Sequence, residues 1–140
     1  VPLPTFYMSS YFNQNRNLYL ESLNSVSKEG NWSTWFKYFL NGIIYSSQES
    51  THKAILINNL YNEMKADILP QLNSIHAMQV IDFIFQHPVF KAKQLINSKL
   101  NIPNKSAYSL LSRLEELNVL ITDENKRNKT YICGNLIKLL

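Results

Sequence analysis

Glycine is scarce in this sequence. Gly30, Gly42 and Gly134 are the three glycines among 140 residues, and they lie far apart. A loop that cradles a phosphate with backbone N–H groups needs clustered glycines, because the chain must approach the anion with unusual backbone angles. Nucleotide-binding loops of the Walker and dinucleotide types are therefore excluded.

Cysteine is also scarce, and the histidines lack partner residues at the spacing of metal ligands. Cys133 is the single cysteine, so no internal disulfide can form, and we expect this side chain to pack as a small hydrophobe. None of the three histidines has a second histidine or a cysteine at metal-ligand spacing. The sequence therefore predicts no metal, no cofactor and no catalytic constellation in this chain. Nothing in it requires an oxidising compartment, and the cytoplasm is the expected location.

Long apolar runs are also missing. No run approaches the ~18 residues that span a bilayer, and no signal peptide is present, so no membrane partner is expected. A composition of 45% hydrophobic and 17% charged residues is that of a folded chain. The first residue is Val1, with Pro2 and Pro4 in an extended lead-in, and we expect a fragment of a longer protein.

Acidic residues are absent from one long stretch. The net charge of +4 lies in residues 71–140, which hold nine basic and five acidic residues, against five of each before them. No acid occurs between Asp82 and Glu115, whereas that stretch contains the basic residues Lys91, Lys93, Lys99, Lys105 and Arg113. This asymmetry favours a polyanionic partner, although an ordinary solvated surface could carry the same charges.

Three amphipathic helices are predicted in the first half, over residues 10–28, 32–44 and 52–69. Ser10 would cap the first helix, Gly30 would follow its end, and Pro70 would stop the third. The polar stretch 46–51 leaves open whether the second and third helices are one. The polar residues 71–76 lie where the charge balance changes, so we place a domain boundary between residues 70 and 71.

The second half has a shorter pattern. Three helices are predicted from Met78 to Phe85, from Lys91 to Leu100 and from Asn104 to Asn118, followed by strands at 119–122 and 130–133. Pro103 opens the third of these helices, whose buried face would contain Ala107, Leu110, Leu111, Leu114 and Leu117. Three short helices and a hairpin with a basic tip predict a winged helix-turn-helix in residues 71–140, within a mainly α chain.

One string in the first half is distinctive. It comprises Leu3-Pro4-Thr5-Phe6-Tyr7-Met8-Ser9-Ser10-Tyr11-Phe12, Arg16, Tyr19, Leu23, Gly30-Asn31-Trp32, Trp35 and Phe39-Leu40-Asn41-Gly42. This string resembles the stretch that follows the active-site motif in bacterial Fic proteins. Residues 75–140, with Leu114-Glu115-Glu116-Leu117 and Arg127-Asn128-Lys129-Thr130-Tyr131, are similar to the winged helix at the C-terminus of many longer Fic proteins.

The resemblance implies that residues 1–70 are the last helices of a Fic-type domain, in which Arg16, Trp32 and Trp35 help to hold the core together. It also implies a parent that transfers AMP from ATP, with Mg, to a hydroxyl group of a target protein. That chemistry uses a His-Pro-Phe-x-x-Gly-Asn-Gly-Arg loop. Here the one His-Pro pair, His87-Pro88, has no glycine after it and lies in the second half. The catalytic motif is absent, so this chain is not expected to be an enzyme itself.

In the helix-turn-helix scheme the third helix enters the major groove of DNA and the wing contacts the adjacent backbone. The DNA-binding residues predicted here are Asn104, Lys105, Ser106, Tyr108, Ser109 and Arg113 on the helix, and Lys126, Arg127 and Lys129 on the wing. The alternative is a protein-interaction or dimerisation module that regulates a Fic core or presents targets to it. A homodimer is compatible with either function.

Overall fold

The computed structural model describes residues 8–123 and 129–140. The described part is mainly helical and contains one small antiparallel sheet, as the sequence predicts. The chain divides into two compact units, residues 1–55 and residues 56–140, and the boundary falls inside a single long helix.

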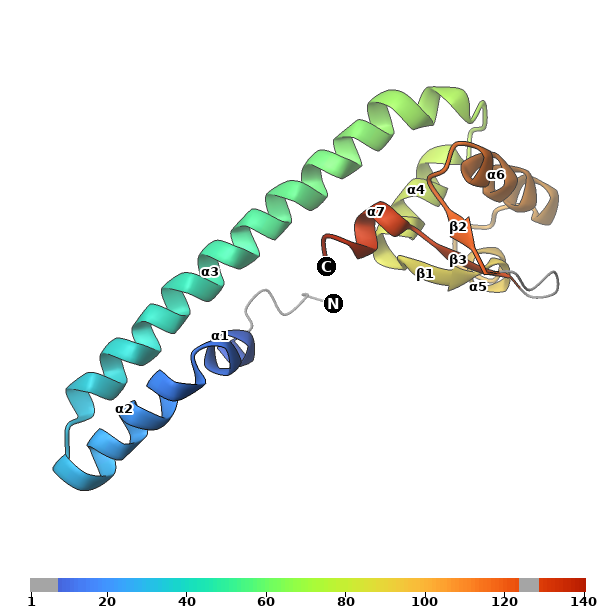
Figure 1. Cartoon of the computed structure of the whole chain (residues 1–140). Coiled ribbons are helices and arrows are strands. Elements are labelled where there is room, and N and C mark those ends of the chain that lie inside the picture. Colours follow the sequence, from blue (N-terminus) through green and yellow to red (C-terminus); the bar gives the residue numbers. More distant parts are fainter. Residues whose placement is uncertain (1–7, 124–128) are drawn as a thin grey trace. The chain divides into compact units, whose positions relative to one another are not determined.

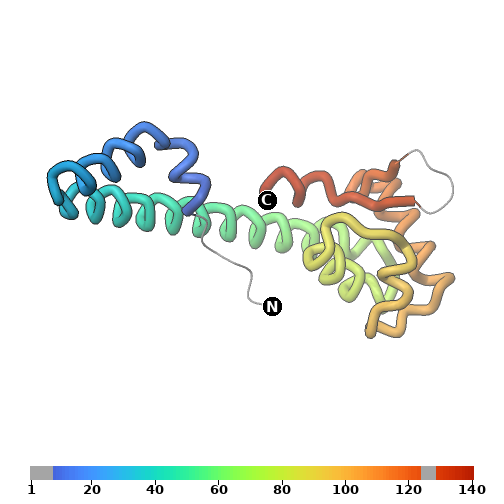
Figure 2. Tube along the Cα trace, turned by 90° about the horizontal axis from the view of Figure 1, so that it is seen from below, coloured from blue at the N-terminus to red at the C-terminus, as the bar shows by residue number. Residues whose placement is uncertain are grey.

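In the first unit, helices α1 (Met8–Gln14) and α2 (Arg16–Glu29) run beside the first part of α3 (Trp32–Glu63) (Figures 1 and 2). The prediction of one helix over residues 10–28 was wrong, because the backbone leaves helical geometry at Asn15, with φ −113° and ψ 37°, and this separates α1 from α2. Ser10 is not the cap either, since α1 begins at Met8. Gly30 does end α2, with a left-handed φ of 64°.

Helix α3 is continuous through the polar stretch 46–51. The Ser47 hydroxyl donates to the Ile43 carbonyl at 2.7 Å, and the Thr51 hydroxyl donates to the Ser47 carbonyl at 2.8 Å. These side chains are therefore satisfied within the helix and do not compete with it. A π turn, Met64–Ile68, and a 3-10 turn, Leu69–Gln71, follow Glu63, so the regular helix ends before Pro70.

A cluster of aromatic rings holds the first unit together. Tyr38 of α3 is buried, and its ring lies within 6.3 Å, centroid to centroid, of the rings of Tyr11, Phe12, Tyr19 and Trp35. Gly42 lets α1 approach α3 closely, because a Cβ atom there would come within 2.7 Å of the Tyr11 ring. Packing thus explains why a glycine follows the aromatic run of α3.

The second unit contains α4 (Ala77–Gln86), β1 (Val89–Lys91), α5 (Ala92–Ile96), α6 (Asn104–Glu116), β2 (Ile121–Thr122), β3 (Thr130–Ile132) and α7 (Gly134–Ile137). The strands form an antiparallel sheet in the order β1-β3-β2, with Phe90 opposite Tyr131 and Ile121 opposite Ile132. The predicted helices at 78–85 and 104–118 and both predicted strands are confirmed, each with shifted ends.

The helix predicted over residues 91–100 was wrong in part. Residues 89–91 form β1, and the helix that follows ends at Ile96. Phe90 is buried, stacks on the Tyr131 ring at 5.6 Å and meets the Phe83 ring edge-on at 5.2 Å. Pairing of β1 with β3 therefore buries the Phe90 ring. A strand of so few residues is too short for its periodicity to be recognised in the sequence. Helix α7 was likewise not predicted.

The apolar core of the second unit lies between α4, α5, α6 and the sheet. Its fully buried members include Val80, Ile81, Ile84, Phe90, Leu95, Leu111, Leu114, Leu120, Cys133 and Leu136. Met64 is also buried in this core, and Ile57, Leu60 and Tyr61 pack against it. The end of α3 therefore belongs to the second unit, which begins earlier than the boundary predicted after residue 70.

Candidate nucleic-acid interface

Helix α6 has one buried face and one exposed face. Ala107, Leu110, Leu111 and Leu114 are buried, as predicted, and Leu117 is half-buried. The predicted contact residues on this helix lie on the other side: Asn104, Lys105, Tyr108, Ser109 and Arg113 are exposed, and Ser106 is half-buried. A helix with this arrangement can present its polar side to a ligand while its apolar side stays in the core.

Arg113 is held by a neighbouring acid. Its guanidinium Nη1 lies 2.7 Å from Glu116 Oε2, one turn further along α6. An exposed pair of this kind contributes little to stability, but it places a negative charge beside the arginine. Arg113 is therefore partly neutralised by Glu116, a residue that the sequence-based site did not include.

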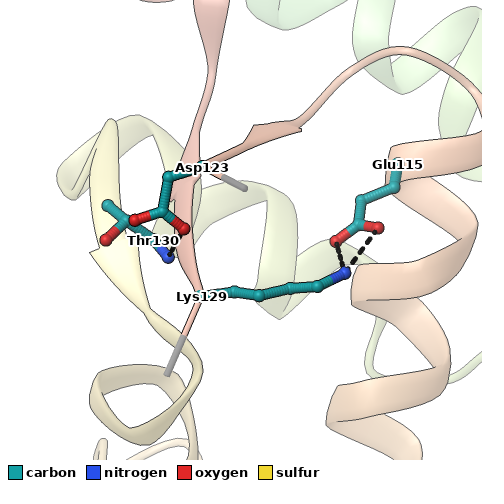
Figure 3. Close-up of polar contacts among 4 residues, drawn as sticks. All are labelled: Glu115, Asp123, Lys129 and Thr130. Carbon is teal, nitrogen blue, oxygen red and sulfur yellow. Dashed lines mark hydrogen bonds and ion pairs between the residues drawn. The ribbon is translucent and has the colours of Figure 1, made fainter. Parts of the chain in front are cut away.

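Lys129 is paired in a similar way. Its ammonium reaches from the β2–β3 hairpin to the Glu115 carboxylate of α6, with Nζ 3.3 Å from Oε2 (Figure 3). Tyr131 is close by, and burial, followed by the charge of Glu115, raises its pKa. Lys129 thus ties the hairpin to α6.

The base of the hairpin is closed by two hydrogen bonds. The Thr130 backbone N–H donates to the Asp123 carboxylate at 3.0 Å, and the Asp123 N–H donates to the Thr130 carbonyl at 3.3 Å (Figure 3). Lys126 and Arg127, the other two predicted wing contacts, lie outside the described residues.

Three further lysines of the second unit are exposed. Lys91 ends β1, Lys93 lies on α5, and Lys99 follows α5; all three are exposed. Arg113 and Lys129 each form an ion pair, whereas within residues 8–123 and 129–140 no ion pair involves Lys91, Lys93, Lys99 or Lys105. The charge pattern of the sequence pointed to these lysines, but they were not assigned to the site.

A cavity of about 820 Å³ lies beside the exposed face of α6. One wall is the segment 71–74, before α4, and the other is α6; the lining residues are Gln71, Leu72, Asn73, Ser74, Lys105, Ser106, Ser109, Leu110, Ser112, Arg113 and Glu116. Four predicted contact residues are thus brought together in it. The wall at 71–74 was missed, because its polar sequence was interpreted as a linker.

Other kinds of site are not evident in the described residues. No group of three or more His, Cys, Asp or Glu side chains is placed there to hold a metal ion. None of the helices described has the length and apolar character needed to cross a membrane. No protein-family model matches the chain. The likeness to Fic proteins therefore stays a hypothesis that rests on the quoted residues.

Proposed function

We propose that residues 56–140 act as a winged helix-turn-helix that binds double-stranded DNA, with α6 in the major groove and the β2–β3 hairpin as the wing. The observation that carries this proposal is the exposed side of α6, where Asn104, Lys105, Ser109 and Arg113 face outward over a fully buried apolar side. Asparagine and arginine side chains can read base edges, and lysine and serine side chains bind phosphate.

The charges support the same partner. Lys91, Lys93 and Lys99 lie on the elements that precede α6, in a stretch without acidic residues. Such a surface attracts the phosphate backbone irrespective of base sequence.

Two classes of mutant test the proposal. Alanine at Lys126 and Arg127 should weaken binding to all duplexes alike, because a wing that contacts the backbone carries no sequence information. Changes at Asn104, Ser109 or Arg113 should alter which duplex is preferred, by about 1–3 kcal/mol for each base that is no longer read. Selection of duplexes from a random pool by each variant measures both effects. If the α6 variants and the wing variants selected the same duplex sequences from the pool, base recognition by α6 would be ruled out.

The alternative function is a protein-interaction or dimerisation module. Glu115 and Glu116 favour it, because each neutralises a cation that DNA would otherwise use. The substitution Glu116→Gln distinguishes the two functions. If the partner is DNA, removal of this negative charge should raise affinity for any duplex. If the partner is a protein whose charges are complementary to the paired surface, Glu116→Gln should weaken that protein complex. Neither the unmodified chain nor the variant should then bind a duplex.

For the longer parent, the likeness of residues 3–45 to Fic proteins suggests AMP transfer from ATP to a protein target. We propose that this chain has no such activity alone, since it contains no phosphate-cradling loop. Incubation of the purified chain with labelled ATP and candidate targets should give no incorporation, and labelling by the chain itself would refute this.

A further inference from the structure

The cavity beside α6 is rich in hydrogen-bond donors that have no partner. Of its lining residues, Asn73, Lys105, Ser109 and Ser112 make no side-chain hydrogen bond or ion pair within the part of the chain that the structure describes. Lys105, Ser109 and Ser112 follow each other at steps of four and three residues, so they share one side of α6. The cavity therefore presents one ammonium and several neutral donors to a single space.

The opposite wall is shaped by Asn73. Its φ of 44° lies in the left-handed region, and its side chain is exposed at the edge of the cavity. Two neighbouring groups already make one hydrogen bond each: the Gln71 amide donates to the Asp67 carbonyl at 2.7 Å, and the Ser74 hydroxyl accepts from the His76 N–H at 3.3 Å. Asn73 is the polar side chain of this wall that makes no hydrogen bond within the described residues.

The chemistry of the cavity matches a phosphodiester. Phosphate oxygens accept hydrogen bonds from ammonium, amide and hydroxyl groups, and such bonds fix the register of a protein on DNA. The lining has one carboxylate, Glu116, and Arg113 neutralises it. An acidic ligand is therefore not repelled, whereas a cationic ligand would find no free acid.

We propose that the segment 71–74 forms a second wall of the DNA interface, where Asn73 donates a hydrogen bond to a backbone phosphate that Lys105 also contacts. This inference rests on the proposed function. It adds a contact from outside the helix-turn-helix elements. It predicts that the DNA backbone is contacted from both walls of the cavity, by Asn73 on one side and by Lys105 on the other.

The test compares two asparagines with the same backbone. Asn118 also has a left-handed φ, 56°, and is exposed, but it does not line the cavity. Glycine adopts this conformation without strain, so Asn73→Gly and Asn118→Gly each remove a side chain at a similar backbone cost. The thiol reactivity of buried Cys133 verifies that the second unit is folded in each variant.

Binding of the full chain to a labelled duplex is then measured over a range of salt concentrations. Asn73→Gly should weaken binding roughly tenfold, the size expected for a hydrogen bond to a charged group, without changing the salt slope. Lys105→Ala should reduce the log–log slope by about 0.9, because one phosphate is no longer neutralised. Asn118→Gly should bind like the unmodified chain.

Equal binding by Asn73→Gly and Asn118→Gly would overturn the second wall while leaving DNA binding by α6 in place. Failure of the unmodified chain to bind any duplex at low salt would overturn both. If inorganic phosphate protected Lys105 from amine modification and duplex DNA did not, the cavity would bind free phosphate instead, and the proposed DNA contact would be wrong.

Discussion

Residues 8–55 and residues 56–140 are built from similar amphipathic helices, but they bury very different amounts of apolar surface. Among the described residues of the first unit, Tyr38 is the one large apolar side chain that is buried. A stripe along its α3 helix stays more than half exposed, with Trp32 at 58%, Phe36 at 56%, Leu40 at 55% and Ile44 at 56%. The second unit has a continuous core drawn from α3 to α7.

The difference predicts unequal stability. Burial of apolar surface is the main favourable contribution to folding, and the first unit obtains little of it from its own residues. Its aromatic cluster adds about 0.5–1.5 kcal/mol for each favourable ring pair. We therefore expect residues 8–55 to unfold before residues 56–140, unless another surface covers the exposed stripe. Both tryptophans lie in the first unit and the one cysteine lies in the second, so each unit has its own probe.

The largest expected effect is that of Leu111→Ala. Leu111 is fully buried in the core of the second unit, and removal of such a side chain costs about 2–5 kcal/mol. Native-state labelling of Cys133 by a thiol reagent should accelerate strongly. Tryptophan fluorescence in urea should show the same transition as before, because that signal comes from the other unit. A shift of both probes together would contradict the division into two units, and the exposed neighbour Ser112→Ala serves as the control.

Gly42→Ala should disturb the first unit instead. The new Cβ would lie 2.7 Å from the Tyr11 ring and 2.8 Å from the Met8 side chain, so α1 must move away from α3. Overpacking of this kind costs about 1–3 kcal/mol, offset by about 1 kcal/mol of helix propensity. Tryptophan fluorescence should report an earlier urea transition. Gly134→Ala is the matched control, since its Cβ would meet its nearest neighbour at 3.7 Å.

A smaller effect should appear at alkaline pH. Burial raises the pKa of the Cys133 thiol above its ordinary 9.0, so the folded state keeps a proton that the unfolded state loses. This contribution is complete below about pH 9 and is lost as the pH rises through the raised pKa. The urea transition followed by circular dichroism should therefore move lower between about pH 8 and pH 10. In Cys133→Ala the pH-dependent fall of the urea transition should be smaller. If the fall is undiminished, other titrating groups cause it and the Cys133 prediction is wrong.

The sequence predicted the features that depend on helical periodicity. The buried and exposed sides of α6 were correct residue by residue, from Ala107 to Leu114. The continuity of α3 could not be predicted, because Ser47 and Thr51 favour either a break or a helix, depending on whether their hydroxyls bond back to carbonyls. The break at Asn15 could not be predicted either, because its amide bonds back to the Tyr11 carbonyl just as the two hydroxyls bond back within α3.

The candidate site was predictable only in part. The basic residues were visible as a run without acids, but their partners were not. Arg113 and Glu116 are one turn apart, so their pairing could have been expected from spacing. Lys129 and Glu115 meet because the hairpin folds against α6, which no local pattern encodes. The wall at 71–74 has the same origin, since its polar residues gain a role only from their position beside α6.

The central claim is that the second unit binds DNA through unpaired cations around α6. Its most direct test is the binding of the full chain to a labelled duplex of random sequence as salt is raised from about 50 to about 200 mM. Contacts from Lys91, Lys93, Lys99 and Lys105, together with Lys126 and Arg127 of the proposed wing, predict a log–log slope of roughly −5, at about −0.9 per phosphate. Absence of binding at the lowest salt, or affinity that does not change with salt, would contradict the claim.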